Sequence, residues 1–146
     1  MSKAIFLDID GVLNDISPST PVFDDTPAPR HIQPLVEIVN ATGAKLILSS
    51  SWRKSRRLRI RVDEALARFN LTIADITPEL SGGRGREISA YLEQHPEITS
   101  FLILDDDDWG WAPHLIKHWV QTSPLSGLLP RHIKPAITIL DFGIAE

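Results

Sequence analysis

Short apolar runs alternate along this chain with longer stretches of mixed apolar and polar residues. Short apolar runs are typical of buried strands, and the mixed stretches are typical of helices with one face on a core. We expect strands at residues 4–9, 45–50, 72–76, 101–104 and 119–122. We expect helices at residues 33–42, 55–69, 86–94 and 132–142.

This alternation predicts the fold class. Strands that alternate with helices form βαβ units, in which a parallel sheet is sandwiched between helices. The gaps between strands are too short for a second domain, so residues 1–146 are expected to form a single unit. We predict an α/β, three-layer, Rossmann-like fold whose central parallel sheet has about five strands. Proline-rich residues 17–29 indicate a loop, and only the segment 14–30 is long enough to form a small flap.

The composition is that of an ordinary soluble protein, with 42% apolar and 23% charged residues. No apolar stretch approaches the ~18 residues of a membrane span, and there is no basic and apolar leader. Because the chain has no cysteine, disulfides, zinc–thiolate sites and a cysteine nucleophile are excluded. We therefore expect a cytoplasmic protein with no membrane segment.

The charges are unevenly distributed, although the formal net charge is only −4. Six basic residues lie between positions 53 and 61, after the second predicted strand. Four consecutive aspartates, residues 105–108, follow the fourth predicted strand. Because parallel strands end at the same edge of a sheet, both segments are expected to begin at that edge.

The most informative segment is Asp8-Ile9-Asp10-Gly11, directly after the apolar residues 4–7. Side chains alternate along a strand, so Asp8 and Asp10 are expected to project to the same side at its carboxyl end. Two carboxylates crowded there repel each other unless a cation lies between them or one is protonated. A simple turn is the alternative, because Asp and Gly are common turn residues. A turn accounts for Gly11 but not for both carboxylates, so the pattern favours a chemical role.

Polar residues also follow the other predicted strands. The second strand ends in Ser49-Ser50-Ser51 and the fourth in Asp105–Asp108, while Ser81–Arg86 is a glycine-rich stretch with two cations before a helix. Each has a structural alternative, because serines cap helices, acids favour a helix N-terminus and glycines make turns. Four acids in a row exceed what a cap needs. Carboxylates, hydroxyls and a cation at one edge are together a set that holds a divalent metal and a phosphate.

These motifs resemble those of haloacid-dehalogenase-like (HAD) phosphohydrolases along nearly the whole chain. That superfamily has Asp-x-Asp after the first strand, a Ser or Thr after the second, a Lys or Arg before a helix and an acidic pair after a later strand. The strings FLDIDGVLN, SSWR, GRGREI, LILDDD and GLLPRHIKPAITIL resemble more closely the HAD domain of Swiss-army-knife RNA repair proteins. The matching residues are Asp8 with Asp10, Ser50 with Ser49 as the alternative, Arg84 in preference to Arg86, and Asp105 with Asp106.

The resemblance implies an activity and a role for each motif. Asp8 is expected to attack phosphorus and form an aspartyl-phosphate, while Asp10 protonates the leaving oxygen and then activates water. Ser50 and Arg84 are expected to hold the phosphoryl oxygens. This chain departs from the family pattern in having three candidate hydroxyls and an Arg where Lys is commoner. Leaving-group protonation by Asp10 favours phosphoester hydrolysis over dehalogenation.

The resemblance also implies a metal and a set of contacts with the substrate. Mg²⁺ is expected because carboxylates, a backbone carbonyl and waters form an all-oxygen site. Its expected ligands are Asp8, the carbonyl of Asp10, Asp105 and Asp106. Further substrate contacts are expected from Gly11, Ser49, Ser51, Trp52, Arg53 and Arg86.

The substrate class is less closely defined by the sequence. No cap domain fits within the chain, and an open site suits a large phosphorylated substrate such as an RNA or DNA end. The basic residues at 53–61 could contact a phosphate backbone and Trp52 could stack on a base. The alternative is a solvated helix face with Trp52 in the core. Trp109 and Trp111 could likewise line the mouth of the site or fill the core.

Three functions are consistent with these features. The first is a Mg²⁺-dependent phosphatase that acts on polynucleotide ends, and the second is a small-molecule phosphatase such as a nucleotidase. The third is a binding module without catalysis, which holds nucleic acid or a protein. Intact Asp8 and Asp10 argue against the third. The sequence makes no prediction about the oligomeric state.

Overall fold

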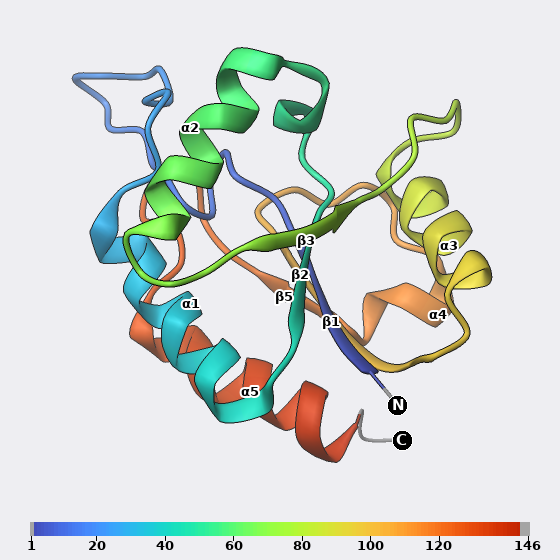
Figure 1. The fold of residues 1–146 in the computed structure, drawn as a ribbon. Coiled ribbons are helices and arrows are strands. Elements are labelled where there is room, and N and C mark those ends of the chain that lie inside the picture. Colours follow the sequence, from blue (N-terminus) through green and yellow to red (C-terminus); the bar gives the residue numbers. More distant parts are fainter. Residues whose placement is uncertain (1, 144–146) are drawn as a thin grey trace.

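Five parallel strands form one sheet in the computed structural model, which describes residues 2–143 (Figure 1). The strands are β1 (Ser2–Leu7), β2 (Lys45–Leu48), β3 (Ile73–Ile76), β4 (Ile98–Asp105) and β5 (Trp119–Gln121). Their order is β3-β2-β1-β4-β5, so the chain runs from β1 to one edge and then crosses to the other side of β1. Open α/β sheets bind ligands where the strand order reverses in this way. The predicted α/β fold with a parallel sheet is confirmed.

Helices cover both faces of the sheet and produce three layers (Figure 1). The helices are α1 (Pro29–Thr42), α2 (Arg56–Ala67), α3 (Arg84–Gln94), α4 (Pro113–Ile116) and α5 (Ile133–Phe142), with the 3-10 turns η1 (Ser51–Lys54) and η2 (Pro130–His132). Helices α1, α2 and α5 pack on one face with Ile5 and Leu7 of β1, whereas α3 and α4 pack on the other with Ala4 and Phe6. Burial on both faces explains why residues 4–7 of β1 are an unbroken apolar run.

The structure differs from the sequence prediction mainly at the ends of elements. β1 ends at Leu7 rather than at residue 9, because the chain turns there and the carbonyl of Ile9 accepts hydrogen bonds from two later amides. α1 begins at Pro29, the last residue of the expected loop, since the fixed φ of proline suits the first helical position. η1 and α4 are single turns and are too short to show a helical pattern in the sequence.

The segment between β1 and α1 is a loop rather than a cap domain. Residues 8–28, all of which the structure describes, contain no helix, and their only β-pairing is an isolated bridge between Ser17 and Thr20. An ion pair of 2.8 Å between Asp25 and Arg57 attaches this loop to α2. The segment therefore agrees with the predicted minimal cap. Within residues 2–143, no helix is both long enough and apolar enough to cross a membrane.

Arg53 links the carboxyl ends of two strands to a helix through hydrogen bonds. The prediction that it contacts the substrate is therefore wrong. The side chain is buried, and its Nη2 lies 2.8 Å from the Glu87 carboxylate in α3. The other four hydrogen bonds, at 2.9 to 3.1 Å, go to the backbone carbonyls of Ser49, Ser50, Thr77 and Pro78. A guanidinium has five N–H donors, so none is left for a substrate. Arg53 is a structural residue.

The prediction that Trp52 contacts the substrate is also wrong, because Trp52 lies in the larger core and cannot stack on a base. It is 4% exposed and packs among the apolar residues beneath α1 and α2. The turn η1 directs Trp52 and Arg53 inward, whereas Ser51 and Lys54 are exposed. The six basic residues of segment 53–61 therefore comprise one buried arginine, one half-buried arginine (Arg59) and four exposed residues.

Replacing Arg53 tests this structural role. Arg53→Ala should lower the free energy of unfolding by about 3–5 kcal/mol, because it leaves the Glu87 carboxylate buried without its partner. Denaturant unfolding followed by circular dichroism measures the change. Arg57→Ala is the matched control, since Arg57 is exposed and its ion pair with Asp25 faces water, so its effect should be far smaller. Equal, small effects of the two variants would contradict the structural assignment of Arg53.

Candidate active site

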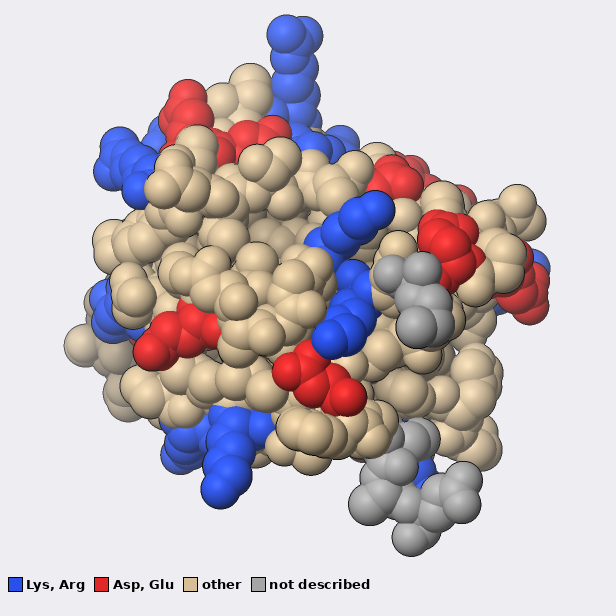
Figure 2. Space-filling view, turned by 60° about the horizontal axis from the view of Figure 1, so that its bottom comes forward, with Lys and Arg blue, Asp and Glu red and all other residues tan. Residues whose placement is uncertain are grey.

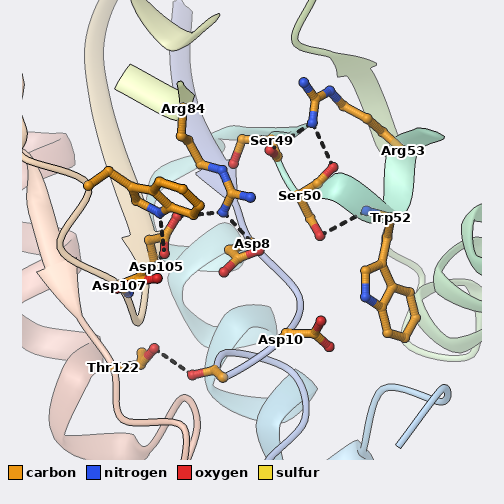
Figure 3. Close-up of polar contacts among 12 residues, drawn as sticks. Asp8, Asp10, Ser49, Ser50, Trp52, Arg53, Arg84, Asp105, Asp107 and Thr122 are labelled. Atoms are coloured by element: carbon orange, nitrogen blue, oxygen red, sulfur yellow. Dashed lines mark hydrogen bonds and ion pairs between the residues drawn. The ribbon is translucent and has the colours of Figure 1, made fainter. Parts of the chain in front are cut away.

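Three polar side chains meet at the carboxyl ends of the central strands. Asp8 follows β1, Ser49 follows β2 and Asp105 ends β4. They lie at one level because the residues just before them are paired across the three strands. The amides of Asp8 and Ser49 continue this pairing, each donating to a carbonyl of the neighbouring strand at 3.0 Å. Figure 3 shows Arg84 reaching down between Asp8 and Asp105.

Asp8, Asp105 and Asp106 form an acidic cluster. One carboxylate oxygen from each lies within 4.8 Å of the others, and Asp8 and Asp105 are 5% and 0% exposed. Burial, and then the charge of Asp105, raises the pKa of Asp8 well above its ordinary value. The same two causes raise the pKa of Asp106 to about 6. Crowded carboxylate oxygens are the ligands of hard divalent cations, so this cluster could hold Mg²⁺.

Arg84 supplies positive charge to the acidic cluster from the first turn of α3. Its Nη1 lies 2.8 Å from Oδ2 of Asp105 and 3.1 Å from Oδ1 of Asp8. Burial by itself lowers the pKa of Arg84, but the two carboxylates outweigh burial and raise that pKa. The indole of Trp109 covers the guanidinium at 4.6 Å and donates to Oδ1 of Asp105 at 3.3 Å. The guanidinium of Arg84 is therefore fixed both by its ion pairs with the two carboxylates and by the indole of Trp109.

Neighbouring cationic and aromatic residues lie in different surroundings. Arg86 is exposed and donates to the backbone carbonyl of Ser81 at 2.9 Å, so the structure does not bring it to the acidic cluster. Trp109 is 46% exposed and lies at the rim of the site, whereas Trp111 is buried in the smaller core. Of the two alternatives predicted for these residues, Trp109 therefore lies at the mouth of the site and Trp111 fills the core.

The three serines after β2 have different surroundings. Ser49 is buried, and its Oγ has no hydrogen-bond partner within residues 2–143. The Oγ of Ser50 accepts from the amide of Trp52 at 3.1 Å and caps η1. Ser51 is exposed at the start of η1. An unpartnered buried hydroxyl needs a ligand or a water, so the geometry favours Ser49 over Ser50 as the hydroxyl for a phosphate.

Asp10 and Gly11 form the tight turn after β1. The Asp10 carboxylate lies outside the acidic cluster, and its Oδ1 accepts from Nδ2 of Asn14 at 2.9 Å. Gly11 has a φ of 79°, and a Cβ on it would clash with the Asp106 carboxylate. The hydroxyl of Thr122 donates to the Gly11 carbonyl at 2.6 Å (Figure 3). Gly11 thus lets the loops after β1 and β4 approach each other, which is a packing role.

Sequence reasoning missed four residues at or beside this site, namely Asn14, Thr77, Glu87 and Thr122. Thr77 lies beside Ser49 in the sheet, and its Oγ1 is also buried without a partner in the described part of the chain. Thr77 and Thr122 each come directly after a strand, so the reasoning applied to the serines could have found them. Asn14 and Glu87 had no such signal, because their roles depend on contacts that only the folded chain creates.

Comparisons with known proteins agree with this geometry. The family model described as the HAD domain in Swiss Army Knife RNA repair proteins matches residues 4–133. The matched range contains every site residue described above, from Asp8 to Thr122. A search of curated proteins and a search of solved structures each found no match. Because the family model matches most of its length, the chain belongs to the family of HAD domains found in Swiss Army Knife RNA repair proteins.

Proposed function

We propose that this protein is a phosphomonoester hydrolase in which Asp8 accepts the phosphoryl group. The observation that carries the proposal is the surroundings of Asp8, a buried carboxylate that shares the Arg84 guanidinium with Asp105. The Ser49 hydroxyl, which has no hydrogen-bond partner within residues 2–143, directly follows the neighbouring strand. A phosphoryl group bound here would find donors for its oxygens and a carboxylate nucleophile beside them. Membership of the HAD family supports a phosphohydrolase.

The reaction proceeds through two phosphoryl transfers. In the first, a carboxylate oxygen of Asp8 attacks phosphorus, the bond to the leaving oxygen breaks, and Asp10 donates a proton to that oxygen. In the second, Asp10 takes a proton from a water whose oxygen attacks the same phosphorus, so phosphate leaves and the Asp8 carboxylate is restored. Arg84 and Ser49 bond the phosphoryl oxygens in both transfers.

The acidic cluster fits the Mg²⁺ ion that membership of the family implies. Its donors are carboxylate oxygens, which Mg²⁺ prefers. Burial, and then the charge of Asp105, raises the pKa values of Asp8 and Asp106, and a bound cation would offset both effects by favouring the ionised carboxylates. The proposed ligands are Asp8, Asp105 and Asp106 with the backbone carbonyl of Asp10. When bound, the ion would supply positive charge that offsets the charges of the phosphate and the carboxylates.

We further propose that the substrate is the phosphorylated end of RNA or DNA. No separate domain covers the carboxyl ends of the strands within residues 2–143, and such an arrangement suits a long substrate better than a small one that must be enclosed. Trp109 is 46% exposed at the rim and could stack on a base. The family description, which names RNA repair proteins, supports the same class of substrate.

The exposed basic residues of η1 and α2 begin close to the site. Arg57 and Arg59 are paired with Asp25 and Asp63, and Arg61 donates a hydrogen bond to Thr26. Within residues 2–143, the side chains of Lys54 and Arg56 make neither an ion pair nor a hydrogen bond. The latter two are therefore the best candidates for contacts with a phosphate backbone. At the opposite end of the sheet, basic and acidic side chains are interspersed (Figure 2).

Removing the nucleophile tests the reaction. Asp8→Asn should abolish turnover and leave the fold intact, because an amide is nearly isosteric with the carboxylate but cannot form the acyl-phosphate. Phosphate release should be measured with Mg²⁺ from p-nitrophenyl phosphate, mononucleotides and oligonucleotides carrying 3′- or 5′-phosphates. Oligonucleotides should have the highest kcat/KM, and preferred mononucleotides would favour a small-molecule phosphatase. Activity of Asp8→Asn within tenfold of the unmodified protein would exclude Asp8 as the nucleophile.

Removing one charge from the acidic cluster tests the metal site. The raised pKa of Asp106, about 6, means that the folded state holds this proton more tightly than the unfolded state, where the pKa is about 4. The contribution of Asp106 to the stability of the metal-free protein is therefore fully present below about pH 4 and is lost as the pH rises through about 6. Asp106→Asn should remove this decrease and raise the Tm in EDTA at pH 7.5 by roughly 2–4 °C.

The measurement is thermal unfolding in EDTA at pH 5 and pH 7.5, followed by addition of Mg²⁺. The gain from Asp106→Asn should be larger at pH 7.5, and Mg²⁺ should raise the Tm of the unmodified protein more than that of the variant. Asp107→Asn is the matched control, because it makes the same change in an exposed neighbour. A lower Tm for Asp106→Asn in EDTA at pH 7.5 would show that the cluster is not strained by its charge.

Replacing Lys54 and Arg56 tests the substrate class. Lys54→Gln combined with Arg56→Gln should raise KM for a phosphorylated oligonucleotide and leave p-nitrophenyl phosphate almost unaffected. The salt dependence of the oligonucleotide KM should weaken, by about 0.7 in the log–log slope for each backbone phosphate that the variant no longer binds. Lys3→Gln with Lys45→Gln is the control, since these residues begin β1 and β2 at the opposite end of the sheet. Equal effects of the two double variants would mean that η1 and α2 do not contact the substrate.

A further inference from the structure

Asn14 is a buried side-chain amide that bonds both the turn after β1 and the loop that follows it. It is 1% exposed. Its Oδ1 accepts from the Gly11 amide at 2.9 Å, and its Nδ2 donates to Oδ1 of Asp10 and to the backbone carbonyl of Asp24, each also at 2.9 Å. These partners fix the orientation of the amide, because a flipped amide would turn its donors toward the Gly11 N–H and its oxygen toward two acceptors.

The hydrogen bond from Asn14 to Asp10 indicates what the buried amide does. Within residues 2–143, Asn14 provides the only hydrogen bond to the Asp10 carboxylate. A side chain of similar size, such as leucine, could fill the same space, so packing does not require a donor at this point. Because Oδ1 of Asp10 already accepts a hydrogen bond, Oδ2 is the oxygen left to carry the proton that the proposed reaction transfers.

The bond to Asp24 extends this contact to the loop between β1 and α1. Asp24 is followed by Asp25 and Thr26, which contact Arg57 and Arg61 of α2. One amide therefore connects the Asp10 turn to a loop that is itself attached to a helix. This connection holds the Asp10 carboxylate in a fixed position relative to the rest of the fold. A proton donor needs such a position, because it must come within hydrogen-bond distance of the leaving oxygen.

We propose that Asn14 is a positioning residue for Asp10, holding the carboxyl group in the rotamer from which it protonates the leaving oxygen. The inference rests on the proposed phosphatase function and adds to it a residue outside the four motifs. Protonation matters little for a leaving group that is already a stable anion, such as p-nitrophenolate, and matters greatly for an alkoxide. Replacement of Asn14 should therefore lower kcat/KM mainly for substrates with poor leaving groups.

The test compares kcat/KM for p-nitrophenyl phosphate with that for an alkyl phosphate, here the phosphorylated oligonucleotide. Asn14→Leu removes every hydrogen bond, and Asn14→Asp keeps an acceptor for the Gly11 amide but has no donor for Asp10. Both should lower kcat/KM for the alkyl phosphate by about 10- to 100-fold and for p-nitrophenyl phosphate by less than about threefold. Thr122→Val is the matched control, since it removes another buried hydrogen bond to the same turn, at the Gly11 carbonyl. It should not change the ratio between the two substrates.

A second measurement separates positioning from a general effect on folding. In an Asp10→Asn background the carboxyl group is absent, so Asn14→Leu should cause no further selective decrease on the alkyl phosphate. Equal decreases on both substrates, or the same selective decrease without the Asp10 carboxyl, would overturn the inference while leaving the phosphatase assignment intact. An unmodified protein that releases no phosphate from any substrate would overturn the proposed function, and the role of Asn14 with it.

Discussion

The burial of two neighbouring carboxylates is the constraint on which the site depends. Asp8 and Asp105 are 5% and 0% exposed at the ends of adjacent strands, so each is stripped of water and also meets the charge of the other. Removing the partner of a buried charge costs about 3–5 kcal/mol, which is too much to leave uncompensated. Arg84 is placed between them, and Trp109 covers it. The start of α3 is therefore positioned by charge as well as by apolar packing.

A second ion pair strengthens this placement. Glu87 lies three residues after Arg84, and residues with this spacing share one face of a helix. Its Oε2 accepts from Arg53 at 2.8 Å and from the Leu80 amide at 3.0 Å. Arg84 thus joins α3 to the carboxylates of β1 and β4, while Glu87 joins the same turn of α3 to the ends of β2 and β3. The positive end of the helix disfavours a cation at Arg84, so these carboxylate partners also offset that cost.

The sequence was sufficient for the fold and for the motif positions, because these depend on local patterns. The apolar runs and their alternation with helices determine the parallel sheet, and strand ends indicate where polar residues gather. The choice among three consecutive serines was not available from residue type, since only the pairing of β2 with β1 puts Ser49 beside Asp8. Arg53 was misassigned because it stands in a basic segment typical of a solvated helix face, and its partners, among them Thr77 and Glu87, are distant in sequence.

The negative charge of the acidic cluster and of the substrate explains why the proposed reaction needs a bound cation. Asp8, Asp105 and Asp106 lie beside the Arg84 guanidinium, and burial together with the charge of Asp105 raises the pKa values of Asp8 and Asp106. A phosphate monoester brings about two further negative charges. At an effective dielectric constant of 20, like charges about 4 Å apart repel by about 4 kcal/mol, so the substrate and the ionised cluster cannot share this space unaided. A divalent cation together with Arg84 would balance the charge of the three carboxylates, and the proposed nucleophile, metal ligands and phosphate contact are then mutually consistent.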